Sequence, residues 1–250
     1  MKKIPIALQL WSIRDDVAKD LGGALKEISK MGYQGVETAG LGNTSAADWT
    51  KMLADNNLKV AGAHVGIDLV EADTLQETID TYAAIGCKRL VVPALPMEMR
   101  TTLDGYRRAC SILNIAAGKC AEQGVELGYH NHAFEFEFVE NRIPYFLMLD
   151  MLMSNIFLQF DFGWVYRGGA DGAALTLSNP GRQNTVHIKA YQPDNDTAVV
   201  GEDSIPWKEV FEACETVGKT EWYIVEHERY ANPPMVCVKQ CIDNLRAMGK

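Results

Sequence analysis

Several features that mark common classes of protein are missing from the sequence. The six cysteines form no CxxC pair and fall mostly in apolar patterns, so we expect them to be reduced core residues. The apolar run after the two N-terminal lysines stops at Gln9 without a small-residue cleavage site, which favours a first strand over a signal peptide. Neither a membrane segment nor disorder is indicated, and we expect a cytoplasmic protein.

Positive charge is also scarce. The chain has 24 Lys and Arg residues against 33 Asp and Glu, a formal net charge of −9. This balance repels phosphate backbones and disfavours nucleic acid as a partner. With 47% hydrophobic residues in 250, the chain has enough apolar material for one large core.

Strand-like and helix-like segments alternate from end to end. The expected strands are Ile4–Leu10, Gly35–Thr38, Lys59–Val65, Lys88–Pro93, a fifth beginning after Gly124, Ile156–Asp161, Thr185–Ala190 and Trp222–Glu226. The expected helices include Leu21–Met31, Ser45–Asn56, Thr74–Ile85, Thr101–Gln123, Pro144–Met153, Ala170–Leu177, Trp207–Val217 and Pro234–Met248. Eight βα units without a linker predict an α/β protein with a single (β/α)8 TIM barrel over residues 1–250. A doubly wound open sheet is the alternative, but no GxGxxG follows the first strand to favour it.

Side chains that bind metals or transfer protons gather at the carboxyl ends of these strands. The fifth strand leads into YHNHAFEF, which places His130 and His132 on one face and Glu135 just beyond. The other such residues at strand ends are His64, Asp161, His187, Lys189 and Glu226. Because the active sites of TIM barrels lie where the βα loops emerge, this clustering predicts a functional site suited to a divalent metal or to proton transfer.

The motifs DFGWV, VHIKAY and IVEHE, with YHNHAFEF before them, resemble those of the xylose-isomerase-like TIM-barrel superfamily. That superfamily contains the sugar phosphate isomerases and epimerases, the inosose dehydratases and endonuclease IV. The resemblance covers nearly the whole chain and is closest to the branch whose fifth strand ends in YHNHxFEF. One motif departs from it, since GEDSIPW has Asp203 and Pro206 where the family has Gly and Asp.

The resemblance implies one divalent metal, most often Mn²⁺, with Zn²⁺, Co²⁺ or Mg²⁺ as alternatives. By motif, Asp161, His187 and Glu226 are expected ligands. Many relatives have Glu where the first His of YHNH stands, so His130 occupies that ligand position while Glu135 supplies the nearest carboxylate. We expect Glu135 as the fourth ligand, with His130 as the alternative.

Such a site suggests chemistry beside a carbonyl group. Glu226 or Glu135 would accept a proton from the carbon next to the carbonyl, and Lys189 or a histidine such as His132 would stabilise the resulting negative oxygen. The residues expected to contact substrate are His64, His130, Trp11, Trp164 and Arg167, and Glu37 lies near the same strand ends. Because positive charge is otherwise scarce there, we expect a neutral sugar or keto-sugar.

The function expected from these patterns is that of a metal-dependent sugar isomerase or epimerase. A lyase or hydratase acting on a keto-sugar, keto-glycoside or inosose is the close alternative, since the same enolate can expel a leaving group. An endonuclease IV-like hydrolase and a non-catalytic sugar-binding barrel are further alternatives. Whether the chain forms a homodimer or another homo-oligomer is left open.

Overall fold

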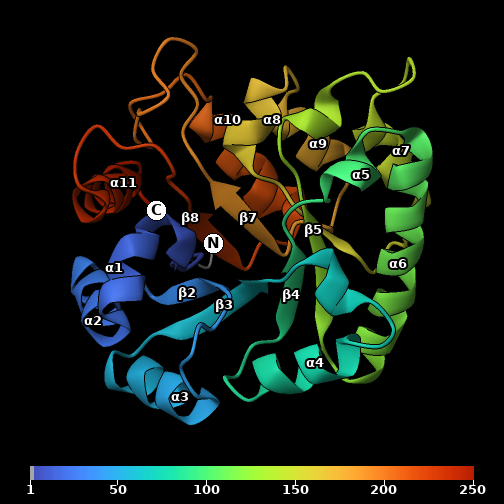
Figure 1. Cartoon of the computed structure of the whole chain (residues 1–250). Coiled ribbons are helices and arrows are strands. Elements are labelled where there is room, and N and C mark those ends of the chain that lie inside the picture. Colours follow the sequence, from blue (N-terminus) through green and yellow to red (C-terminus); the bar gives the residue numbers. More distant parts are fainter. Residues whose placement is uncertain (1–2) are drawn as a thin grey trace.

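The structure is a computed structural model that describes residues 3–250, and it contains eight parallel strands. They are β1 (Ile6–Gln9), β2 (Gly35–Ala39), β3 (Lys59–His64), β4 (Arg89–Val92), β5 (Glu126–His130), β6 (Phe157–Gln159), β7 (Thr185–Ile188) and β8 (Trp222–Val225). Their order is β6-β5-β4-β3-β2-β1-β8-β7, with every neighbouring pair parallel. The expected (β/α)8 barrel is confirmed (Figure 1).

The sheet closes between β6 and β7 by very few contacts. The two strands form no ladder within residues 3–250, and an isolated parallel bridge joins Asp161 to His187 instead. The backbone N–H of His187 also donates to the carbonyl of Phe160 at 2.8 Å. The backbone bridge at this closure therefore involves two of the expected site residues.

Helices cover the outside of the barrel (Figure 1). Their bounds are α1 (Arg14–Lys19), α2 (Leu21–Met31), α3 (Ala46–Asp55), α4 (Leu75–Ala83), α5 (Met97–Arg100), α6 (Leu103–Glu122), α7 (Pro144–Met151), α8 (Phe162–Arg167), α9 (Gly172–Ser178), α10 (Trp207–Ala213) and α11 (Pro234–Ala247). Local sequence explains their ends: Ser45 caps α3 by accepting from the backbone N–H of Asp48, and Gly32 ends α2 at φ 95°, a left-handed conformation that glycine tolerates best.

The strands that the sequence predicted are present; β2 is one residue longer than expected, the others are shorter by one or more residues, and the eight main helices match their expected segments. The short helices α1, α5 and α8 were not predicted, because four to six residues are too few for a periodic pattern. The single domain expected over residues 1–250 includes residues 1–2, which lie outside the described part.

Apolar side chains from the strands and helices form one extended core, and Ala7, Ala61, Trp222 and Ile224 form a small second cluster. All six cysteines are buried and free, which confirms the expectation of thiols in the core. Among residues 3–250, no helix is both long enough and apolar enough to span a lipid bilayer. The polar side chains described next lie inside a barrel whose other buried residues are mostly apolar.

Candidate metal centre and active site

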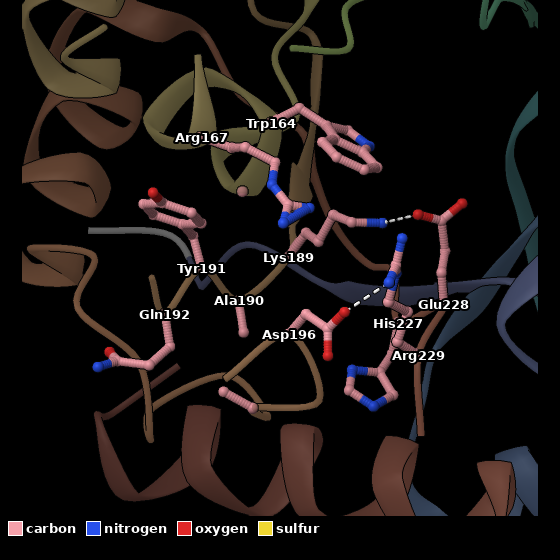
Figure 2. A pocket seen from close by; sticks show the side chains of 12 residues that line it. Trp164, Arg167, Lys189, Ala190, Tyr191, Gln192, Asp196, His227, Glu228 and Arg229 are labelled. Carbon is pink, nitrogen blue, oxygen red and sulfur yellow. Dashed lines mark hydrogen bonds and ion pairs between the residues drawn. The ribbon is translucent and has the colours of Figure 1, made fainter. Parts of the chain in front are cut away.

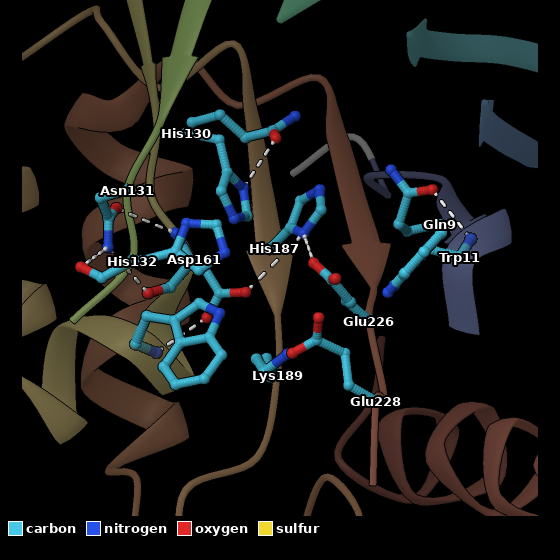
Figure 3. A network of polar contacts seen from close by, with 12 residues as sticks. Gln9, Trp11, His130, Asn131, His132, Asp161, His187, Lys189, Glu226 and Glu228 are labelled. Atoms are coloured by element: carbon cyan, nitrogen blue, oxygen red, sulfur yellow. Dashed lines mark hydrogen bonds and ion pairs between the residues drawn. The ribbon is translucent and has the colours of Figure 1, made fainter. Parts of the chain in front are cut away.

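Four strands bring a potential metal ligand to the same end of the barrel. His130 is the last residue of β5, Asp161 follows β6, His187 lies on β7 and Glu226 follows β8. Each offers one ligand atom, and these atoms all lie within 4.8 Å of one another. All four residues are buried, and they point toward one another in Figure 3. We refer to them as the four-residue group.

The two carboxylate oxygens of Asp161 have different surroundings. Its Oδ1 accepts from the backbone N–H of Trp164 at 2.8 Å and so caps α8. Its Oδ2 is buried, yet it accepts no hydrogen bond from any group within residues 3–250. Burial, reinforced by the nearby Glu226 carboxylate, raises the pKa of Asp161 to about 7. A buried carboxylate oxygen without a partner is costly, and a divalent cation in the four-residue group would satisfy it.

His187 lies between two carboxylates. Its Nε2 is 2.6 Å from Glu37 Oε2, and its Nδ1 is 2.6 Å from Glu226 Oε2. Burial opposes the charged imidazolium, but Glu37 and Glu226 outweigh it and raise the pKa of His187 to about 10. Burial also opposes the ionised form of Glu226, yet Lys189 and His187 hold its pKa well below the usual range. His187 is therefore an imidazolium at neutral pH, and a metal ion bound at its Nδ1 would replace the proton on that atom.

Glu135 lies outside the four-residue group. Its Oε1 accepts from the Tyr129 hydroxyl at 2.5 Å, and its Oε2 accepts from the backbone N–H of His132 at 2.8 Å. A short 3-10 helix, Phe134–Phe136, turns this side chain into the protein. Burial raises the pKa of Glu135 to about 8, although both hydrogen bonds oppose the shift. The geometry therefore brings the alternative residue, His130, to the position at which Glu135 was expected.

A second cluster of polar side chains lies inside the barrel beside the group. Glu37 on β2 is fully buried and accepts from Gln9 Nε2 at 2.8 Å and from Gln159 Nε2 at 2.7 Å. His64 Nε2 lies 3.0 Å from Glu37 Oε2 and 2.8 Å from Gln159 Oε1. Burial opposes ionisation of Glu37, but His64 and His187 hold its pKa well below the usual range. We call Gln9, Glu37, His64, Gln159 and His187 the Glu37 network.

Lys189 extends toward a pocket at the edge of this site. Its Nζ pairs with Glu228 and lies 4.7 Å from the centre of the Trp164 ring. Burial opposes the charge on Lys189, but Glu226 and Asp161 raise its pKa, so it is a cation. Trp164, Arg167 and Lys189 all line the pocket in Figure 2, with the exposed Arg167 guanidinium 5.5 Å from the Trp164 ring.

His132 and Trp164 each present a polar atom that has no hydrogen-bond partner among residues 3–250. The His132 ring stacks on Phe134 and lies 5.4 Å from the Trp164 ring, centre to centre. His132 Nδ1 and Trp164 Nε1 are buried and make no hydrogen bond within the described part of the chain. Burial lowers the pKa of His132 to about 4, so its imidazole is neutral. Two such atoms beside the four-residue group are suited to contacts with a bound polar molecule.

Trp11 follows β1 and is 48% exposed, with the Arg14 guanidinium 5.0 Å from its ring. Figure 3 shows Trp11 on the β1 side of the site, away from His132 and Asp161. Its exposed ring leaves it free to contact a ligand.

The departure at GEDSIPW has a structural explanation, because Asp203 accepts from the backbone N–H of Gly201 at 3.1 Å and of Ile205 at 2.8 Å. Asp203 thus fixes the shape of its own loop.

Sequence reasoning did not identify Gln9 and Gln159 and gave Glu37 no role. The available signal was a polar residue inside an otherwise apolar strand, as in IALQL and IFLQFD. Gln159 also precedes Asp161 by two positions, the spacing that puts two side chains on the same face of a strand. A buried amide at that spacing indicates an interior hydrogen-bond network.

Comparison with known families assigns the chain. The sequence model described as xylose isomerase-like TIM barrel matches residues 25–248, which is most of the length. The chain belongs to this family. The resemblance found in the motifs is thereby confirmed. No curated protein sequence matches the chain.

Solved structures share the fold over nearly the full length. A sugar phosphate isomerase/epimerase from Parabacteroides distasonis is 27% identical, with a TM-score of 0.85 and 98% of each chain covered. A second from the same organism is 21% identical, with a TM-score of 0.86, covering 99% of this chain and 95% of the other. A D-allulose 3-epimerase from Methylomonas sp., in complex with D-allulose, is 14% identical with a TM-score of 0.73, covering 99% and 98%.

Proposed function

We propose that this protein is a divalent-metal-dependent isomerase or epimerase of a sugar or keto-sugar, acting by proton transfer beside a carbonyl. The observation that carries the proposal is the four-residue group, in which the buried Asp161 Oδ2 has no partner among the described residues. The family membership supports it, as do the similar structures of a sugar phosphate isomerase/epimerase and a D-allulose 3-epimerase.

Asp161, His187, Glu226 and His130 would hold the metal, with His130 in place of Glu135. Two carboxylates and two imidazoles suit Mn²⁺, Co²⁺ or Zn²⁺. Once bound, the ion would act as a Lewis acid on the oxygens of the substrate.

Glu226 is the proposed base. Its low pKa keeps it ionised at neutral pH, and its Oε2 is held 2.6 Å from His187 Nδ1. Lys189 is a cation that would stabilise the negative charge developing on the substrate oxygen, and the neutral His132 would hydrogen-bond a hydroxyl group. Glu135 would fix the backbone of His132 through the 2.8 Å hydrogen bond, and we assign it no proton transfer.

The substrate class follows from the lining of the pocket. Trp164 offers an aromatic face beside Lys189, which pairs with Glu228. Arg229 pairs with Asp196, so two of the three cations that line the pocket are offset, and among the described residues only the exposed Arg167 is not. A site with this balance favours a neutral sugar over a phosphorylated one. Loss of water or of an aglycone from the substrate would instead indicate the lyase alternative.

The activity can be tested by solvent exchange. The Mn²⁺-loaded protein should be incubated with a panel of ketoses and keto-sugars in D2O, and C–H exchange and products followed by NMR. We expect deuterium at the carbon beside the carbonyl together with an isomer or epimer. Absence of exchange with every sugar would contradict the proposal, and an eliminated product would replace it with lyase chemistry.

Two variants separate the base from the metal site. Glu226→Gln keeps one ligand oxygen but removes the proton acceptor, so exchange should fall by ~10²–10⁴-fold even with excess Mn²⁺. Asp161→Ala should lose the metal itself, measured by metal analysis of the purified protein. Normal exchange in metal-loaded Glu226→Gln would exclude Glu226 as the base.

A further inference from the structure

Glu37 sits at the centre of a hydrogen-bond network whose polarity can be worked out. An ionised carboxylate only accepts hydrogen bonds, so every group that contacts Glu37 must donate to it. Gln159 Nε2 faces Glu37 Oε1 at 2.7 Å and also lies 2.8 Å from Thr185 Oγ1. The carboxylate therefore fixes which end of the Gln159 amide is nitrogen, and its oxygen must face the other way.

The orientation of Gln159 determines the protonation of two histidines. Its Oε1 lies 2.8 Å from His64 Nε2 and 3.1 Å from His130 Nδ1. Because an amide oxygen only accepts, both of these ring nitrogens must carry hydrogen. With hydrogen on Nδ1 of His130, the neutral ring keeps its lone pair on Nε2. His130 can therefore serve as a ligand in the four-residue group only through Nε2.

Glu37 acts on His187 directly. Its Oε2 lies 2.6 Å from His187 Nε2, which must donate. The opposite nitrogen, Nδ1, faces Glu226 Oε2 at 2.6 Å and Asp161 Oδ2 at 3.8 Å. The nitrogens that face the Glu37 network thus carry hydrogen. On the other side of the rings, His130 Nε2 is left for a metal, and a metal at His187 Nδ1 would displace the proton on that atom.

We propose that Glu37 is a positioning residue for the histidines of this site: it sets the tautomer of His130 through Gln159, and it holds Nε2–H of His187 so that Nδ1 faces the four-residue group. It touches neither the metal nor the substrate in this role. The tautomers are a property of the protein alone, whereas their effect on metal affinity rests on the proposed function. Outer hydrogen-bond partners of this kind typically change metal affinity by ~10–100-fold.

Exchanging the carboxylate and the amide provides a specific test. In Glu37→Gln, the new amide can keep its oxygen toward His187 and Gln9 only by turning its nitrogen toward Gln159. Gln159 must then flip and donate to His64 and His130, which forces hydrogen onto His130 Nε2. In the double variant Glu37→Gln/Gln159→Glu, the carboxylate at position 159 accepts from the new amide and from both histidines. The double variant should restore the original tautomer with the same total charge.

The readout is the ¹⁵N NMR signature of the histidine rings in metal-free protein, with metal affinity measured by titration calorimetry. We expect His130 as the Nδ1–H tautomer in the wild type, as Nε2–H in Glu37→Gln, and as Nδ1–H again in the double variant. Mn²⁺ affinity should fall ~10–100-fold in the single variant and recover in the double. Glu135→Gln, which also replaces a buried carboxylate by an amide, should leave the His130 tautomer unchanged.

Finding His130 as the Nε2–H tautomer in the wild type would overturn the inference. This measurement needs no variant, so it does not depend on whether Glu37→Gln folds. A double variant whose tautomer and affinity match those of the single variant would also overturn it. The expected tautomers in a wild type that binds no metal would uphold the role of Glu37 and instead refute the proposed function.

Discussion

Metal binding should release protons from the site, and the structure determines how many. His187 has its pKa raised to about 10 between Glu37 and Glu226, so at pH 7 its Nδ1 is protonated. Asp161, with its pKa raised by burial to about 7, is about half protonated at that pH. Glu37 and Glu226 are already ionised and His130 is neutral, so they contribute no protons.

The magnitude follows from these pKa values. A metal that binds at pH 7 should displace about 1.5 protons, one from His187 and the rest from Asp161, and at pH 8.5 about one. Displacing the His187 proton at pH 7 costs about 4 kcal/mol, three pH units at 1.36 kcal/mol each. Because protons compete with the metal, affinity should rise with pH, by about 60-fold between pH 7 and 8.5.

Titration calorimetry with Mn²⁺ measures both quantities. Each pH is run in two buffers with different ionisation enthalpies, and the difference in heat gives the number of protons released. Glu135→Gln serves as the control and should release as many protons as the wild type, because Glu135 lies outside the four-residue group. An affinity independent of pH, with no protons released, would refute the assignment of His187 Nδ1 as the ligand atom.

Three further outcomes test separate parts of the structure. Burial raises the pKa of Glu135 from 4.5 to about 8, so the buried carboxyl group stabilises metal-free wild type at low pH. In urea unfolding, the wild type should lose about 3.5 kcal/mol of stability from this group between pH 5 and pH 8, and Glu135→Gln should lose less. Gly128→Ala would place a methyl group 2.5 Å from the Phe157 ring and should lower the free energy of unfolding by ~1–3 kcal/mol in the same assay. The control Gly118→Ala, whose methyl group would have nothing within 4 Å, should not lower it. Equal effects would contradict the packing of β5 against β6. Lys189→Met should retain the metal but lower turnover by ~10²–10³-fold, and unchanged turnover would remove Lys189 from the mechanism.

The barrel was predictable because its strands are short apolar runs separated by amphipathic helices. The errors lie where one side chain serves two elements. Asp161 was expected to end the sixth strand, but its side chain accepts from the Trp164 N–H and begins α8, a six-residue helix too short to show periodicity. Local capping there shortens the strand that the apolar run favoured.

The site was partly predictable for a related reason. Asp161, His187 and Glu226 follow directly from strand ends, since parallel strands deliver such residues to one end of a barrel. The choice between His130 and Glu135 depends on the turn at Phe134–Phe136, which directs Glu135 back to Tyr129. Nor could periodicity reveal the bond between Glu37 and Gln159, which are 122 positions apart in the chain.

The bridge between Asp161 and His187 links assembly of the site to completion of the barrel. These two residues form the isolated backbone bridge between β6 and β7, the two ends of the strand order, where Gln159 and Thr185 also form a side-chain hydrogen bond. A metal held by both residues would crosslink the seam where the described backbone provides the fewest hydrogen bonds. At a free metal concentration of 100 times the Kd, binding would add about 2.7 kcal/mol to the stability of the folded state. The amide of His187, which donates across this seam to Phe160, should then exchange with solvent more slowly in metal-loaded protein. The ion would thus limit opening of the barrel wall as well as activate the substrate.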